Sequence, residues 1–174
     1  MDDIELQLQE SIDTKKALLS ANLDIIRKIA DTVVNAFRNN HRIYLIGNGG
    51  SAADAQHIAG ELIGRFKMNR RPLPAVALTT DTSVITALAN DFGYDTCFAR
   101  QVEALANKGD VVLAFSTSGN SKGIINAVKV ARDAGAITIG FTGKDGGLLG
   151  SAADICLKIP STNAPRIQEC HITV

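Results

Sequence analysis

Five short apolar runs that alternate with helical patterns are the feature that most constrains the fold of this chain. The runs are Ile43–Ile46, Ala75–Leu78, Val111–Phe115, Ile137–Phe141 and Ile155–Ile159. The helical stretches fall near 51–65, 82–90, 96–106, 122–134 and 164–174. Because these runs are mostly apolar, each strand is expected to be buried on both faces. The alternation predicts an α/β fold, an open, doubly wound parallel five-stranded sheet flanked by helices with right-handed crossovers.

The first forty residues follow a helical period instead. An apolar stripe recurs every three or four positions at Leu19, Leu23, Ile26, Ile29, Val33 and Phe37, and a thinner stripe precedes it at Ile4, Leu8 and Ile12. We expect an N-terminal helical extension over 1–40 ahead of an α/β core over 41–174. No linker composition separates them, so the chain is predicted to be a single domain. The extension could cover a sheet face, pair with another subunit, or do both.

Composition excludes several classes of protein. The chain has 174 residues with 18 Lys plus Arg against 18 Asp plus Glu, so it lacks the overall basic charge of nonspecific nucleic-acid binders. No apolar run reaches the roughly 18 residues that a membrane span needs. Cys97, Cys156 and Cys170 form neither a CxxC pair nor an even set. With an acidic start rather than a signal peptide, we expect a cytoplasmic protein that binds neither membrane nor nucleic acid.

The loop over residues 116–121 is rich in hydroxyl groups and precedes a predicted helix. Its hydroxyl residues are Ser116, Thr117, Ser118 and Ser121. Free backbone N–H groups at a helix start favour an anion, and hydroxyls add neutral donors. No lysine follows in the P-loop pattern, which argues against a nucleoside triphosphate. One helix cap needs one hydroxyl, so this excess indicates a phosphate site, with simple capping as the alternative.

A second strand–loop–helix unit precedes it at residues 42–51. The loop Gly47-Asn48-Gly49-Gly50-Ser51-Ala52 follows its strand as residues 116–121 follow theirs. Ligands bind beyond the carboxyl ends of such strands, so two matching loops predict a shared pocket. The loop also fits GxGxxA, and Asp81 ends the next strand, as in a dinucleotide-binding protein. A dinucleotide-dependent oxidoreductase therefore stays as a minor alternative.

The helix after this loop carries His57 and Glu61. Their four-residue spacing places both side chains on one face, near Asp54. The pair could act in acid–base chemistry, bind a metal ion, or form an ordinary surface contact. Other polar residues, in the segments Asn90-Asp91 and Gln168-Glu169, are weak indications of a site on their own.

Taken together, these motifs resemble the phosphoheptose isomerase family of sugar isomerase (SIS) domain proteins. The resemblance rests on the segments 46–57, 87–95 and 114–121 and covers essentially the whole chain. It implies isomerisation of sedoheptulose 7-phosphate to D-glycero-D-manno-heptose 7-phosphate, a step in heptose synthesis for surface lipopolysaccharide. It further implies a cytoplasmic homotetramer with zinc and with active sites near subunit contacts.

The resemblance also assigns roles to residues. It implies that substrate is contacted by Asn48, Gly49, Gly50, Ser51, Glu61, Asn90, Asp91, Ser116, Thr117, Ser118, Ser121 and Gln168. The implied metal positions are His57, Glu61 and Gln168, and Glu61 is the implied catalytic carboxylate. Isomerisation moves a proton between C1 and C2 through an enediol, and one carboxylate can serve both carbons. A carboxylate bound to zinc is a poorer base, and glutamine is an unusual zinc ligand.

The sequence departs from the family at its end. The resemblance implies a second active-site histidine at position 176, but the sequence ends at Val174. His171 would lie about 140° around the helix from that place and is not expected to replace it. We therefore expect a form shortened at its C-terminus that binds sugar phosphate but isomerises poorly. The main alternative is a non-catalytic SIS protein that binds sugar phosphate or a replication-initiator partner; proteins of that branch lack the glutamate, whereas Glu61 is present.

Overall fold

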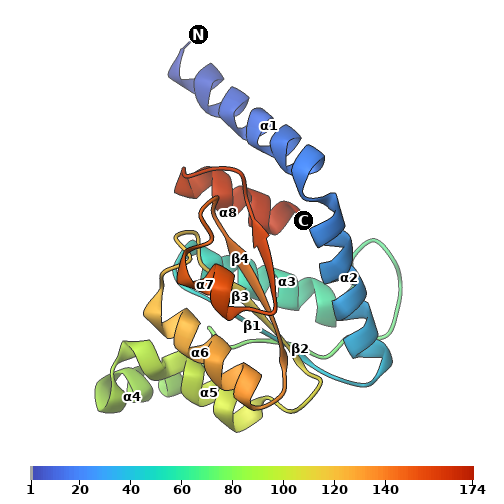
Figure 1. Cartoon of the computed structure of the whole chain (residues 1–174). Helices are drawn as coiled ribbons and strands as arrows, with labels where there is room; N and C mark the ends of the chain where they lie inside the picture. The colour runs from blue at the N-terminus through green and yellow to red at the C-terminus, as the bar shows by residue number, and fades with distance from the viewer. Residues whose placement is uncertain (1) are drawn as a thin grey trace.

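The computed structural model describes residues 2–174, and a parallel five-stranded sheet is at its centre (Figure 1). The strands are β1 (Ile43–Gly47), β2 (Ala75–Ala77), β3 (Val111–Phe115), β4 (Ile137–Thr142) and β5 (Ile155–Lys158), in the spatial order β2-β1-β3-β4-β5. Every residue of β1 and β3 is buried, as expected for strands covered on both faces. The prediction is wrong for the edge strands, because β2 leaves Val76 exposed and β5 leaves Lys158 exposed. The predicted fold class is confirmed.

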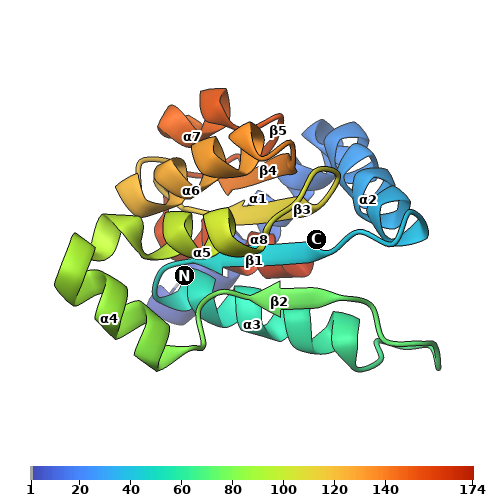
Figure 2. The same cartoon turned by 90° about the horizontal axis from the view of Figure 1, so that it is seen from below.

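Helices cover both faces of the sheet, as Figure 2 shows from below. One buried cluster joins the strands to α2 (Leu23–Arg38), α3 (Gly50–Ile63) and α8 (Ala164–Thr173). A second cluster joins the opposite face to α5 (Cys97–Leu105), α6 (Lys122–Asp133) and α7 (Gly147–Ala152). The helix α4 (Thr82–Phe92) has no buried residue and packs beside α5. Between them, Tyr94–Thr96 forms a single 3-10 turn, η1.

The strand order places a topological switch point between β1 and β3. The two strands pair in parallel, with Gly47 opposite Phe115 at their carboxyl ends. From β1 the chain crosses to β2 on one side, whereas from β3 it crosses to β4 on the other. The loops that follow such a pair of strands diverge and leave a crevice in which ligands of doubly wound sheets bind. The loops 48–49 and 116–121 both begin at this crevice.

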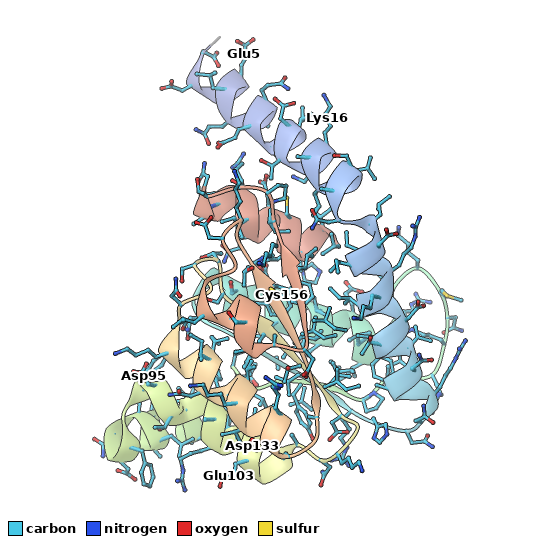
Figure 3. The ribbon with its side chains drawn as sticks, viewed as in Figure 1. Glu5, Lys16, Asp95, Glu103, Asp133 and Cys156 are labelled. Atoms are coloured by element: carbon cyan, nitrogen blue, oxygen red, sulfur yellow. The ribbon has the colours of Figure 1, made fainter. Side chains whose placement is uncertain are left out.

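The N-terminal extension is broken into two helices at Asn22. The second, α2, packs on the sheet through Phe37, which is buried. The first, α1 (Asp3–Ala21), contacts α8 and projects beyond the core, and Figure 3 shows Glu5 and Lys16 along this projecting length. The apolar residues toward its N-terminus remain exposed, Ile4 at 71% and Leu8 at 61%, whereas Leu18 near its C-terminus is buried in the core. Within residues 2–174, no helix combines the length and the apolar character that a membrane crossing requires.

Candidate functional site

The loops after β1 and β3 touch each other at the switch point. The side-chain amide of Asn48 donates a hydrogen bond to the Ser121 hydroxyl oxygen at 2.8 Å. The Asn48 oxygen in turn accepts a hydrogen bond from the Tyr94 hydroxyl at 2.8 Å. The structure therefore brings together the two loops that the sequence pattern paired.

The backbone of the loop 116–121 is held tightly against the next loop of the sheet edge. Gly119 has a φ of +67°, and a side chain there would collide with the Gly146 carbonyl oxygen. The Gly119 oxygen accepts a hydrogen bond from the Leu149 N–H at 2.8 Å, and the Gly119 N–H donates to the Ser116 oxygen at 2.9 Å. Only glycine meets both the conformation and the close approach, so the loop has a fixed shape before any ligand binds.

The hydroxyl groups of this loop are not used as helix caps. Ser121 is the N-cap residue of α6, but its side chain makes no capping hydrogen bond. Within the described part of the chain, the hydroxyls of Ser116, Thr117, Ser118 and Ser121 donate no hydrogen bond. The first turn of α6 also presents backbone N–H groups and the positive end of its dipole. The loop is thus an array of free donors, which is what a phosphate group requires.

The first loop leads directly into α3. Gly49 has a φ of +56° and is the N-cap residue, and nothing lies within 4 Å of the place where its side chain would be. Gly50 has no such space, because a side chain there would overlap that of Gln168. The Gln168 amide donates to the Ser51 hydroxyl oxygen at 3.2 Å. The terminal helix therefore brings Gln168 to the first turn of α3.

His57 and Glu61 form a pair on the same helix. The His57 Nε2 atom lies 3.5 Å from a Glu61 carboxylate oxygen, and the two side chains are 63% and 39% exposed. One turn earlier, burial raises the pKa of Asp54, which a nearby His57 opposes, and one Asp54 oxygen is buried without a hydrogen-bond partner. The predicted one-face placement of His57 and Glu61 is observed, with the imidazole able to hold the carboxylate in place.

The described residues do not form a complete zinc site. Among residues 2–174, no group of three or more His, Cys, Asp or Glu side chains is close enough to hold a metal ion. Gln168 faces Ser51, which precedes Glu61 by almost three helical turns. Zinc takes three or four protein ligands, so His57 and Glu61 provide only part of a set.

Asn90 and Asp91 lie on the exposed last turn of α4. The Asn90 amide donates to the Asp91 carboxylate at 2.8 Å, and neither side chain bonds to the two loops within residues 2–174. Tyr94, just beyond them, makes the link to Asn48. The sequence assigned no role to Tyr94, because its exposure and its contact with Asn48 appear only in the structure.

A cavity of about 530 Å³ lies between α2, α3, the sheet and the end of α8. Its walls are mostly apolar, and its polar lining comes from His57, Glu61, Arg70, His171 and Thr173. No residue of the loop 116–121 lines it. The helix α3 therefore connects two distinct environments, a polar one at its first turn and an apolar one near Glu61.

His171 is a buried histidine whose charge state matters for stability. It is 1% exposed, its Nε2 atom lies 3.3 Å from the Thr142 oxygen, and the rings of Phe115 and Phe141 pack around it. The Nδ1 atom is buried without a partner. This burial lowers the pKa of His171 to about 4. The folded protein therefore holds the imidazole neutral at a pH where the unfolded chain protonates it.

We expect the free energy of unfolding to fall as the pH drops from about 6.5 to about 4. In this window the unfolded chain binds the His171 proton and the folded protein does not, so acid favours unfolding, by an amount on the order of 3 kcal/mol. Urea unfolding of the wild type and of His171→Gln across this range measures the effect. The His171→Gln variant should lose less stability on acidification than the wild type. Parallel curves for the wild type and His171→Gln would contradict the assignment.

The chain is similar to known proteins over most of its length. A family model described as the SIS domain matches residues 8–143. The phosphoheptose isomerase of Roseiflexus sp. (strain RS-1) is 52% identical over 168 residues, which are 97% of this chain and 85% of that protein. The phosphoheptose isomerase of Aquifex aeolicus (strain VF5) is 49% identical over 174 residues, 100% of this chain and 91% of that one.

The fold of the chain is also similar to that of solved phosphoheptose isomerase structures. A phosphoheptose isomerase from Francisella tularensis has a TM-score of 0.96 and 39% identity, covering 99% of this chain and 92% of that one. The phosphoheptose isomerase of Neisseria gonorrhoeae has a TM-score of 0.93 and 41% identity, covering 98% and 91%. The similarity extends from the helical extension through α8, so it includes both loops and the helix that carries Glu61.

Proposed function

The chain belongs to the SIS domain family as one of its phosphoheptose isomerases, and from this premise we propose how its residues carry out the reaction. The reaction converts sedoheptulose 7-phosphate into D-glycero-D-manno-heptose 7-phosphate. The observation that carries the proposal is the contact between Asn48 and Ser121, which joins the two loops into one anion site beside α3. A non-catalytic role is not favoured, because the catalytic carboxylate of the family is present as Glu61.

The phosphate of the substrate would bind to the loop 116–121. Its free hydroxyls and the N-terminus of α6 supply donors without a fixed positive charge, so a dianion is neutralised by hydrogen bonds and by the helix dipole. The other loop, with Asn48, Gly49 and the buried Ser51, would contact the sugar hydroxyls, and Gly49 leaves open space for this. Asn90 and Asp91 are proposed as further substrate contacts from the end of α4.

Glu61 would move the proton. In the forward direction its carboxylate takes a proton from C1 of the open-chain ketose, which gives an enediol. It then returns a proton to C2, which gives the aldose, with a matching proton shift between the oxygens on C2 and C1. His57, 3.5 Å away, would hold the carboxylate in position. Glu61 carries the proton in both halves of the reaction, from C1 and then to C2, so no net charge has to leave the site.

The hydroxyl groups of the substrate distinguish a long sugar phosphate from a short one. A heptulose 7-phosphate carries several hydroxyl groups between its phosphate and its reacting carbons, which a triose phosphate lacks. The loop with Asn48 and Ser51 is proposed to contact these groups. We infer that the site suits a seven-carbon phosphate better than a short one such as a triose phosphate.

The direct test is to add sedoheptulose 7-phosphate to the purified protein and follow the formation of aldoheptose 7-phosphate. We expect slow turnover with this substrate, as anticipated from the sequence, and less still with a triose phosphate. The titration of sugar phosphate in the same samples separates binding from catalysis. Binding of sugar phosphate without turnover would favour the non-catalytic alternative, and binding of NAD(H) would favour the dinucleotide alternative.

Zinc remains a proposal that rests on the family resemblance. His57 and Glu61 are the residues that would contribute first, and Gln168 would have to turn from Ser51 to join them. The metal content of the purified protein, compared with that of His57→Ala, measures this. We expect less bound zinc in the variant; equal content in both would contradict the assignment.

A homotetramer is proposed from the exposed apolar face of α1. Ile4, Leu8, Ile12 and Leu19 are 71%, 61%, 47% and 60% exposed on a helix that projects from the core, and such surface is normally buried between subunits. We also propose that the enzyme works in the cytoplasm, where its product would enter heptose synthesis for surface lipopolysaccharide, as the family resemblance implies.

Introducing charge into the apolar face of α1 should change the oligomeric state. We expect Leu8→Glu combined with Ile12→Glu to form smaller species than the wild type in light scattering, because buried carboxylates would oppose the contact. Lys16→Glu, which changes an exposed charge on the same helix, is the matched control. A monomeric wild type, or an unchanged mass in the double variant, would show that α1 does not form the subunit contact.

A further inference from the structure

Tyr94 lies at the edge of the phosphate site without contacting the loop 116–121 through its hydroxyl. It opens the turn η1, and its side chain is half exposed, so it has no large role in the core. Its hydroxyl donates to the Asn48 side-chain oxygen at 2.8 Å, and the Asn48 amide donates to the Ser121 oxygen at 2.8 Å. We propose that Tyr94 is a positioning residue that, through Asn48, keeps the Ser121 hydroxyl proton available to the substrate phosphate.

The availability of the Ser121 proton depends on the direction of the hydrogen bonds. A serine hydroxyl has one proton, and it can give this proton to an anion only if its other contacts use its oxygen as an acceptor. Asn48 satisfies this condition when its NH₂ group faces Ser121. The Asn48 oxygen then faces Tyr94 and needs a donor, and the tyrosine hydroxyl provides one.

Without the Tyr94 hydroxyl, the Asn48 oxygen loses the hydrogen-bond donor that favours this orientation of the side chain. The Asn48 side chain can turn over, which places its oxygen toward Ser121 and draws the hydroxyl proton away from the ligand. The phosphate then loses one charge-assisted hydrogen bond, the stronger kind of donor contact in the site. The effect is specific to anion binding, since Glu61 lies near the C-terminal end of α3, whereas Asn48 precedes the N-terminus of that helix.

The position of Tyr94 is fixed by α6, the same helix that begins at Ser121. Gly93, with a φ of +86°, turns the chain out of α4, and the next residues form η1. The Asp95 backbone oxygen accepts a hydrogen bond from Asn126 on α6 at 3.2 Å, and Figure 3 shows Asp95 beside this helix. Both ends of the relay from Tyr94 to Ser121 are therefore attached to α6, which keeps their spacing constant.

The test is Tyr94→Phe, which removes the hydroxyl and keeps the ring. The inference rests on the proposed function, so the readouts are the Kd for inorganic phosphate by calorimetry and, separately, the KM and kcat for sedoheptulose 7-phosphate. We expect Kd and KM to rise roughly three- to tenfold, the loss of about one hydrogen bond, with kcat within about twofold. Tyr44→Phe is the matched control, because the Tyr44 hydroxyl bonds to the Leu105 oxygen, away from the loops.

A double-mutant cycle separates positioning from general damage. If Tyr94 acts through Ser121, Tyr94→Phe should have little further effect on Kd in a Ser121→Ala background. Additive losses, or a wild-type Kd in Tyr94→Phe, would overturn the inference and leave the proposed function intact. A wild-type protein that binds no phosphate would overturn both.

Discussion

Glu61→Gln is expected to lower kcat for sedoheptulose 7-phosphate by about a thousandfold and to leave sugar-phosphate binding nearly unchanged. General acid–base groups contribute roughly 10²- to 10⁴-fold, and in this proposal one carboxylate serves both carbons. Glutamine keeps the size and the contact with His57 but cannot take a proton. The loss should therefore appear in kcat, while the phosphate loop, formed by other residues, keeps its affinity.

Steady-state kinetics together with a phosphate titration measures this split. Glu103→Gln, which changes an exposed carboxylate on α5, is the control and should retain wild-type kcat. Turnover like that of the wild type in Glu61→Gln would remove the carboxylate from its role. A loss of binding equal to the loss of kcat would mean that Glu61 holds the substrate rather than moves its proton.

The sheet could be predicted because buried strands carry a strong sequence signal. Runs such as Val111–Phe115 are apolar at every position, and this pattern can be recognised without knowing how the helices pack around the strands. The helix α7 was missed, because a six-residue helix rich in glycine is too short to show a helical period. The break at Asn22 was also missed, since no glycine or proline marks it.

The site could be predicted only in part, because some of its contacts follow from topology or helical spacing and others depend on the path of a turn. The carboxyl ends of adjacent parallel strands lie together, so the approach of Asn48 and Ser121 follows from topology alone. The pairing of His57 with Glu61 follows from helical spacing. By contrast, the contact between Tyr94 and Asn48 depends on how α4 and η1 turn back over the sheet edge. Neither period nor motif encodes that path, so the structure was needed to find it.

Ser121→Asp is expected to reduce the affinity for sugar phosphate by more than about a hundredfold without destabilising the protein. Ser121 is the N-cap residue of α6, and aspartate is at least as good in that position as serine. A carboxylate can also accept the hydrogen bond from Asn48. Its charge, however, would lie close to the phosphate, and two like charges about 4 Å apart near a protein surface repel by on the order of 4 kcal/mol.

This variant is informative because its affinity for sugar phosphate should fall while its free energy of unfolding stays the same. If the hydroxyls of the loop served mainly as caps, Ser121→Ala would cost about 1 kcal/mol of stability and Ser121→Asp would bind ligand normally. If they serve the phosphate, Ser121→Ala should weaken binding only severalfold, because one neutral donor among several is lost, and Ser121→Asp should nearly abolish it. Urea unfolding and phosphate titration of the two variants decide between these roles, because a cap responds to the presence of an acceptor and an anion site responds to the sign of its charge.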